Sequence, residues 1–256
     1  MRLLLATGTL LIGAALAGGA YWTFLTTPES TVFTLAASAA LMLVTLAAAA
    51  LTINLAIEVC GSGLSAAGIR RAARAVPSAL PAALVLLLLS WISSGMEDWF
   101  TIRSGQISAL FIARLGWSDV SWLFHGIHYV AIWLRWVLAA LLATSLMAGV
   151  LASGWPSLRQ PSWIRRALRP RAIIIATAAF ALFVAVPWMY LVPWRPRGIP
   201  ATSAELAFIG AKLAVAAILF AVGAAIIIRE ASRMPPATPT APRRSPRTTY
   251  TRSLAS

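Results

Sequence analysis

The stretch TVFTLAASAALMLVTLAAAALTINLAI, residues 31–57, contains no charged side chain. A helix needs about 20 mainly apolar residues to cross the hydrocarbon core of a membrane. A membrane β-strand would instead be a segment of about ten residues with alternating polarity. The stretch is continuous and long, and therefore it predicts a transmembrane helix.

The composition of the whole chain supports the same class. Of its 256 residues, 60% are hydrophobic and 11% are charged, whereas soluble domains carry about 25% charged residues. Cys60 is the only cysteine, which excludes an internal disulfide and a cysteine-based metal site. We therefore expect an integral membrane protein, with membrane lipids as its surroundings and without a cofactor.

Further apolar runs lie on both sides of residues 31–57. Together they predict an all-α fold, a polytopic helical membrane bundle of about six transmembrane helices within residues 1–233. The fourth run is long for one perpendicular crossing, which indicates tilt or a start in the interface. The expected spans are 3–25, 31–57, 77–95, 122–152, 172–194 and 204–228.

Arginine is concentrated in three segments, 58–76, 154–171 and the chain from 229 onward. Six spans place all three on one side of the membrane, and such segments are normally cytoplasmic. This pattern predicts a multi-pass protein of a bacterial inner membrane with both termini in the cytoplasm. It also explains the net charge of +14 without a nucleic-acid partner. The Pro-, Ser- and Arg-rich residues 234–256 predict a disordered basic cytoplasmic tail.

Two other segments have distinctive patterns. Residues 104–116 place Ile107, Leu110, Phe111 and Leu115 on one helical face, which predicts an amphipathic helix in the outer interface. The first span also resembles a signal peptide, because a short basic start precedes an apolar core and small residues. Cleavage there would leave five spans.

Charged residues inside a span are costly and usually face a protein interior or a cavity. Arg135 in the fourth span and Lys212 in the sixth lie at similar predicted depths. His125 and His128 share a helical face with Arg135, because they follow steps of three and four residues. These four residues predict an anion-binding pocket between the third, fourth and sixth spans. The acidic residues expected at its rim, as ion-pair partners, are Glu97, Asp98 and Glu205.

Other interpretations of these residues remain open. Arg135 could pair with Glu97 or Asp98 and so join the third and fourth spans. The two histidines could share a metal ion with a carboxylate, but the nearby cations oppose a divalent ion, and no metal site is predicted. A serine protease is excluded, because Ser62 and the histidines fall on opposite sides of the membrane.

The favoured function is the binding of an anionic amphiphile, which the protein would contact at a lipid phosphate or a carboxylate. The protein could also move this amphiphile. Arginine suits such a ligand because its planar guanidinium binds anionic groups with two hydrogen bonds. Histidine would make this binding pH-dependent. The alternative is a non-catalytic membrane subunit or scaffold that binds a membrane-protein partner or a second copy of the chain. A third interpretation, an enzyme acting on lipid with a histidine as general base, has no specific motif in its support.

Overall fold

The computed structural model describes residues 1–27, 31–117, 119–191, 193–194 and 202–233. Its described residues form helices and no strands, which confirms the all-α fold class. The predicted tail, residues 234–256, lies outside the described part of the chain.

Six helical segments are long and apolar enough to cross a membrane, as the sequence predicted. The first three are α1 (Arg2–Thr26), α2 (Val32–Gly61) and α4 (Ala79–Ile102). The fourth contains α6 (Ser121–Trp133), the π-helical segment η2 (Leu134–Leu138) and α7 (Ala139–Ser153). The fifth contains α9 (Pro170–Phe180) with the π-helical segments η4 (Ala181–Ala185) and η5 (Pro187–Leu191). The sixth is α10 (Thr202–Ser232).

Shorter helices connect these segments. They are α3 (Ala66–Arg74), η1 (Val76–Ser78), α5 (Ser104–Leu115), η3 (Trp155–Arg159) and α8 (Ser162–Ala167). The range of α5 agrees with the amphipathic helix predicted for residues 104–116.

Helix α7 forms the centre of the fold, because it packs against α4, α8 and α10 and also contacts α2 and α9. Ten of its residues are buried, among them Leu141, Leu146 and Met147. Two hydrophobic clusters meet along this helix, one including Ala56 of α2 and the other Ala176 of α9. Small side chains dominate these contacts and allow the helices to approach closely.

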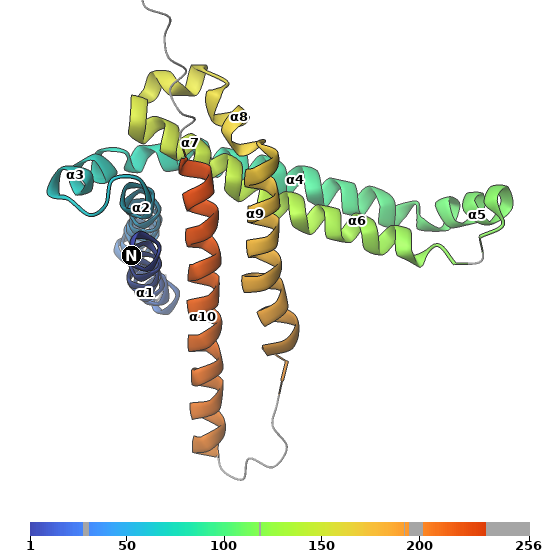
Figure 1. Ribbon diagram of the computed structural model, residues 1–256. Helices are drawn as coiled ribbons and strands as arrows, with labels where there is room; N and C mark the ends of the chain where they lie inside the picture. The colour runs from blue at the N-terminus through green and yellow to red at the C-terminus, as the bar shows by residue number, and fades with distance from the viewer. Residues whose placement is uncertain (28–30, 118, 192, 195–201, 234–256) are drawn as a thin grey trace, which may run out of the picture.

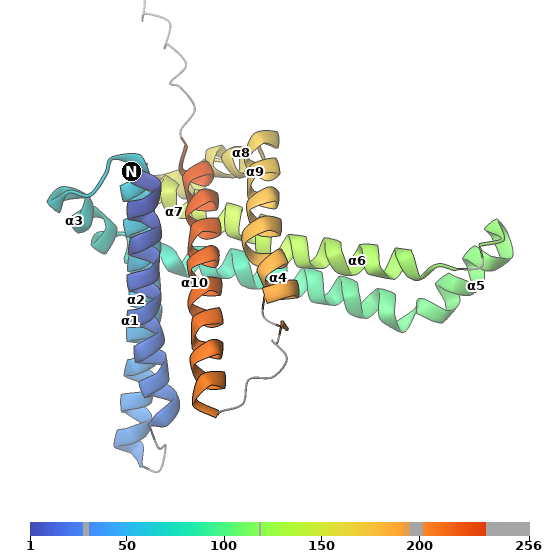
Figure 2. The same cartoon turned by 60° about the horizontal axis from the view of Figure 1, so that its bottom comes forward.

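Helices α4, α5 and α6 form an arm, which is the name used for residues 79–133 below. Figures 1 and 2 show that α4 and α6 run side by side and crosswise to α1, α2 and α10, with α5 at the far tip. The six long segments therefore do not run parallel to one another throughout. The arm joins the core where the side chain of Trp133 donates a hydrogen bond from Nε1 to Oγ1 of Thr177 in α9, at 2.9 Å.

The described parts of the three arginine-rich segments lie at one end of the molecule. In Figure 2, the start of α1, helices α3 and α8, and the end of α10 gather at the top. Arg2 of α1 donates a hydrogen bond from Nη1 to the carbonyl oxygen of Gly61 at this end, at 2.7 Å. We call it the arginine-rich end.

One glycine determines how closely α1 and α2 approach. A Cβ added to Gly13 would overlap the side chain of Thr52, whereas a Cβ added to Gly18 would have no atom within 4 Å. Gly13 therefore lies at the contact between α1 and α2, and Gly18 does not.

Candidate functional site

A cluster of five polar residues lies on the arm and at its join with α7. It is called the arm cluster here: Ser93, Ser94, Glu97, His128 and Arg135. Glu97 is its central member. Its Oε1 is 2.7 Å from Nδ1 of His128, and its Oε2 accepts a hydrogen bond of 3.2 Å from Nη2 of Arg135. One carboxylate thus contacts both the imidazole and the guanidinium and links α4 to the fourth span.

Helix α4 positions the acid because it continues further than predicted. The third span was expected to end near residue 95, so that Glu97 and Asp98 would follow it; α4 instead extends to Ile102. Glu97 consequently has regular helical neighbours one turn before it, Ser93 and Ser94, on the same face. The exposed fraction of the Glu97 side chain is 26%, so that the carboxylate is partly shielded.

Arg135 lies in the π-helical segment η2, at the join between the arm and α7. Such wide turns in helices are frequent at functional sites. Its Nε donates to Oγ of Ser93 at 3.2 Å, and its Nη2 donates to Oγ of Ser94 at 2.9 Å as well as to Glu97. The Arg135–Glu97 ion pair was one of the alternatives that the sequence left open, and it joins α4 to η2.

Two nitrogen atoms of the arm cluster keep hydrogen-bonding capacity. Within the described residues, Nη1 of Arg135 and Nε2 of His128 have no protein partner. The side chain of Arg135 is 33% exposed and that of His128 is 60% exposed. A carboxylate bound to Nδ1 fixes the orientation of an imidazole and leaves Nε2 for a ligand.

The structure places the other predicted site residues elsewhere. Nζ of Lys212 donates to the carbonyl oxygen of Trp194 at 2.7 Å and lies over the ring of Phe208, near the start of α10. Helix α10 packs against α1, α2, α7 and α9, while α4 packs against α6 and α7. Nδ1 of His125 is 2.8 Å from the carbonyl oxygen of Ser121 in its own helix.

The two remaining rim residues, Asp98 and Glu205, are exposed on α4 and α10 respectively. The structure therefore brings together Glu97, His128 and Arg135 of the predicted set, and does not bring Lys212, His125, Asp98 or Glu205 to them.

Sequence reasoning missed Ser93 and Ser94. A signal for them existed, because they precede Glu97 by four and three residues and so share its helical face. Serine within an apolar span often binds its own backbone, so that a serine there is a weak signal for a partner of Arg135. Ser93 does both, since its Oγ also donates to the carbonyl oxygen of Ser90 at 2.8 Å.

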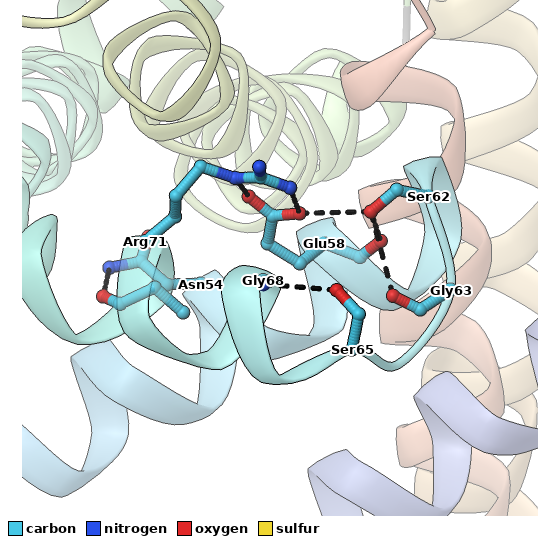
Figure 3. A network of polar contacts seen from close by, with 8 residues as sticks. Asn54, Glu58, Ser62, Gly63, Ser65, Gly68 and Arg71 are labelled. Atoms are coloured by element: carbon cyan, nitrogen blue, oxygen red, sulfur yellow. Dashed lines mark hydrogen bonds and ion pairs between the residues drawn. The ribbon is translucent and has the colours of Figure 1, made fainter.

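A second polar network lies at the arginine-rich end, where α2 meets α3 (Figure 3). Glu58 accepts two hydrogen bonds from Arg71, one from Nε at 2.9 Å and one from Nη2 at 3.0 Å, and a third from Ser62 at 3.0 Å. The carboxylate raises the pKa of Arg71, so the guanidinium stays charged. Because Glu58 is fully engaged, this network is a structural link.

The fold and the arm cluster define a class, a multi-pass α-helical membrane protein with a polar cluster between two of its long segments. Comparisons of the chain with protein-family models, with curated proteins and with solved structures give no match. The function is therefore inferred from the residues themselves.

Proposed function

We propose that this protein binds an anionic amphiphile at the arm cluster, through a lipid phosphate or a carboxylate. Nη1 of Arg135 donates to the anion. Nε2 of His128 donates to it when the imidazole carries both protons, because Nδ1 already donates to Glu97. Glu97 orients both side chains from behind. Lys212 and His125 belong to the wider predicted set but have no part in this site.

One observation carries the proposal: Glu97 divides its two carboxylate oxygens between His128 and Arg135. Glu97 thereby holds His128 at Nδ1 and Arg135 at Nη2, and each side chain keeps another nitrogen for a ligand. Preorganised donors of this kind bind an anion at a lower entropic cost than freely rotating side chains. Arginine in particular recognises planar or tetrahedral anions through its guanidinium group.

The test is native mass spectrometry of the full-length protein, purified from membranes in a mild detergent. The compared forms are the wild type, Arg135→Gln and Arg114→Gln. Arg114 is an exposed arginine of α5 and serves as the control for loss of one positive charge on the arm. Circular dichroism of each form would verify that the helices are retained.

The proposal expects an adduct of defined mass that the wild type and Arg114→Gln retain and that Arg135→Gln loses. An adduct that survives in Arg135→Gln at the wild-type level would contradict it. So would a wild type that carries no adduct and gains none when a phospholipid or a fatty acid is added.

A second candidate function, a non-catalytic membrane subunit, is favoured by the arm itself. Nε and Nη2 of Arg135 are already bound within the chain, which stiffens an arm that extends away from the core (Figure 1). Under this interpretation the arm presents its side to a membrane-protein partner or to a second copy. Arg135→Gln would then lower the stability of the arm and the recovery of a complex together, without removing any small adduct.

The arginine distribution supports a proposed location as well. We infer that the arginine-rich end faces the cytoplasm of a bacterium and that the protein lies in its inner membrane. This proposal is supported by the position of four elements: α3, α8, the start of α1 and the end of α10 lie at the same end of the molecule (Figure 2).

A further inference from the structure

The short helix α8 carries a buried arginine, Arg166, whose side chain lies against the last part of α7. The residue is 8% exposed. Its Nε is closed to solvent and has no hydrogen-bond partner within the described residues. A guanidinium group does not lose its proton at physiological pH, so a positive charge lies inside the protein here.

The acidic residues of the arginine-rich end are engaged with other arginines. Glu58 pairs with Arg71, and Glu230 pairs with Arg171 and Arg233. In the described part of the chain, no ion pair reaches Arg166. The described residues thus supply no paired negative charge to this guanidinium.

A glycine makes room for the side chain. A Cβ added to Gly149 of α7 would lie 2.9 Å from Nη2 of Arg166 and 3.5 Å from Oγ of Ser157. A contact of 2.9 Å is too short for a real Cβ, so any side chain at residue 149 would displace the guanidinium. The position of Arg166 therefore depends on the absence of a side chain on α7.

A second arginine stands one turn further along. The backbone N–H of Arg169 contacts the carbonyl oxygen of Arg166 at 3.5 Å, and the Arg169 side chain is half-buried. Burial, together with the charge of Arg169, lowers the pKa of Arg166. Two neighbouring cations, one of them buried and unpartnered, are unfavourable unless an anion accompanies them.

We propose that a phosphate group binds at this place, held by the guanidinium groups of Arg166 and Arg169. The phosphate belongs to an anionic phospholipid of the adjacent leaflet or is free in solution; both sources offer the same oxygen acceptors. Arginine binds phosphate through paired hydrogen bonds.

This inference does not rest on the arm cluster, which is formed by α4, α6 and η2 rather than by α8. Loss of ligand from one site leaves the other unaffected, and so each proposal can fail alone. Anionic headgroups attract arginine-rich segments near a membrane surface, which brings the lipid to this end in particular.

The experiment is a native mass spectrometry titration of the full-length, delipidated protein in detergent. Phosphatidylglycerol, phosphatidylcholine and inorganic phosphate are added separately. The variants are Arg166→Gln, which removes the buried charge, and Gly149→Ala, which displaces the guanidinium without changing any charge. Arg159→Gln is the matched control, because Arg159 is an exposed arginine of the same segment.

We expect Arg166→Gln to weaken phosphatidylglycerol binding about tenfold, the effect of losing one charge-assisted hydrogen bond. Gly149→Ala should weaken it in the same direction, and Arg159→Gln should not. Competition by inorganic phosphate, lost in the same variants, would identify free phosphate as the source. If Arg166→Gln fails to fold, the binding of phosphatidylglycerol by Gly149→Ala tests the proposal.

Two results would overturn the proposal. One is a wild type that retains phosphatidylglycerol no better than phosphatidylcholine and also binds no inorganic phosphate. The other is equal binding of the phosphate-bearing ligands by the wild type, Arg166→Gln and Gly149→Ala. Retention lost equally in all three variants would also contradict it, because only general surface charge would then be responsible.

Discussion

Glu97 and His128 lie 31 positions apart in the chain, yet their side chains are joined by a contact of 2.7 Å between Oε1 and Nδ1. The contact exists because α4 and α6 run side by side along the arm. The second oxygen of Glu97 binds Arg135. A single acid therefore links the arm to the segment that enters the core, and its removal is the most direct test of this arrangement.

We expect Glu97→Ala to lower the free energy of unfolding by about 1–3 kcal/mol, the usual cost of leaving polar partners unsatisfied. The physical reason is that Arg135 would keep its charge in an apolar span without an acid. Unfolding by titration with sodium dodecyl sulfate in mixed micelles measures the change. Asp98→Ala is the control, since Asp98 is the next residue and is exposed. Equal losses in the two variants would contradict the role given to Glu97.

The contact between α1 and α2 gives a prediction in which two similar substitutions have opposite effects. Gly13→Ala should lower the free energy of unfolding by about 1–3 kcal/mol, because its Cβ would overlap Thr52. Gly18→Ala meets open space and should leave stability unchanged or raise it by up to about 1 kcal/mol through helix propensity.

The same mixed-micelle titration measures both glycine variants. Thr52→Ala, combined with Gly13→Ala, removes two of the three overlapping atoms and should recover part of the loss. If the two glycine variants prove equally stable, the close approach of α1 and α2 is wrong.

The start of α6 provides a pH-dependent contact at the arm tip. Oδ1 of Asp119 accepts a hydrogen bond of 2.8 Å from the backbone N–H of Ser121, and this bond lowers the pKa of Asp119 from its ordinary 3.8. Because the folded pKa is the lower one, the stabilisation is present above the unfolded pKa and is lost as the pH falls through the folded pKa. Carboxyl NMR of the labelled protein in micelles should show a midpoint below 3.8.

Ser121→Pro is the matched variant for this measurement. Residue 121 is the first of α6, where proline is compatible with a helix but supplies no N–H. The midpoint of Asp119 should return toward 3.8 in this variant. A midpoint unchanged by the substitution would mean that the Ser121 N–H does not bind the carboxylate.

The fold was largely predictable because its signal is local. Apolar runs that are as long as a membrane crossing predicted the six long segments. Helices α1 and α2 lie within a few residues of the predicted ranges. The crosswise direction of the arm was not predictable, because it depends on how α7 packs against α4 and α10. Hydropathy reports which residues avoid water, and it carries no information on the angle between helices.

The candidate site was predictable only in part. Helical spacing placed His128 and Arg135 on one face, and the ion pair of Arg135 with Glu97 was among the alternatives. Lys212 was assigned to the same pocket from depth alone. Depth does not determine which helices are neighbours. Helix α10 packs with α9, and Lys212 therefore binds the carbonyl oxygen of Trp194, which follows the fifth long segment.

The last prediction concerns the orientation of the molecule in the membrane. It can be tested by cysteine labelling, because replacing Cys60 alone gives a background without cysteine. In a Cys60→Ser background, one new cysteine is placed at Ser162 of α8 and another, separately, at Ser104 of α5. Helix α8, which begins at Ser162, lies at the arginine-rich end, and helix α5, which begins at Ser104, lies at the arm tip (Figures 1 and 2). If the arginine-rich end is cytoplasmic and the arm crosses the bilayer, a membrane-impermeant maleimide should label Ser104→Cys in intact spheroplasts. Ser162→Cys should react only after lysis. Labelling of Ser162→Cys in intact spheroplasts would reverse the proposed orientation. Protection of both positions until lysis would show that α4 and α6 lie along the membrane, as their crosswise direction relative to α1, α2 and α10 permits, rather than across it.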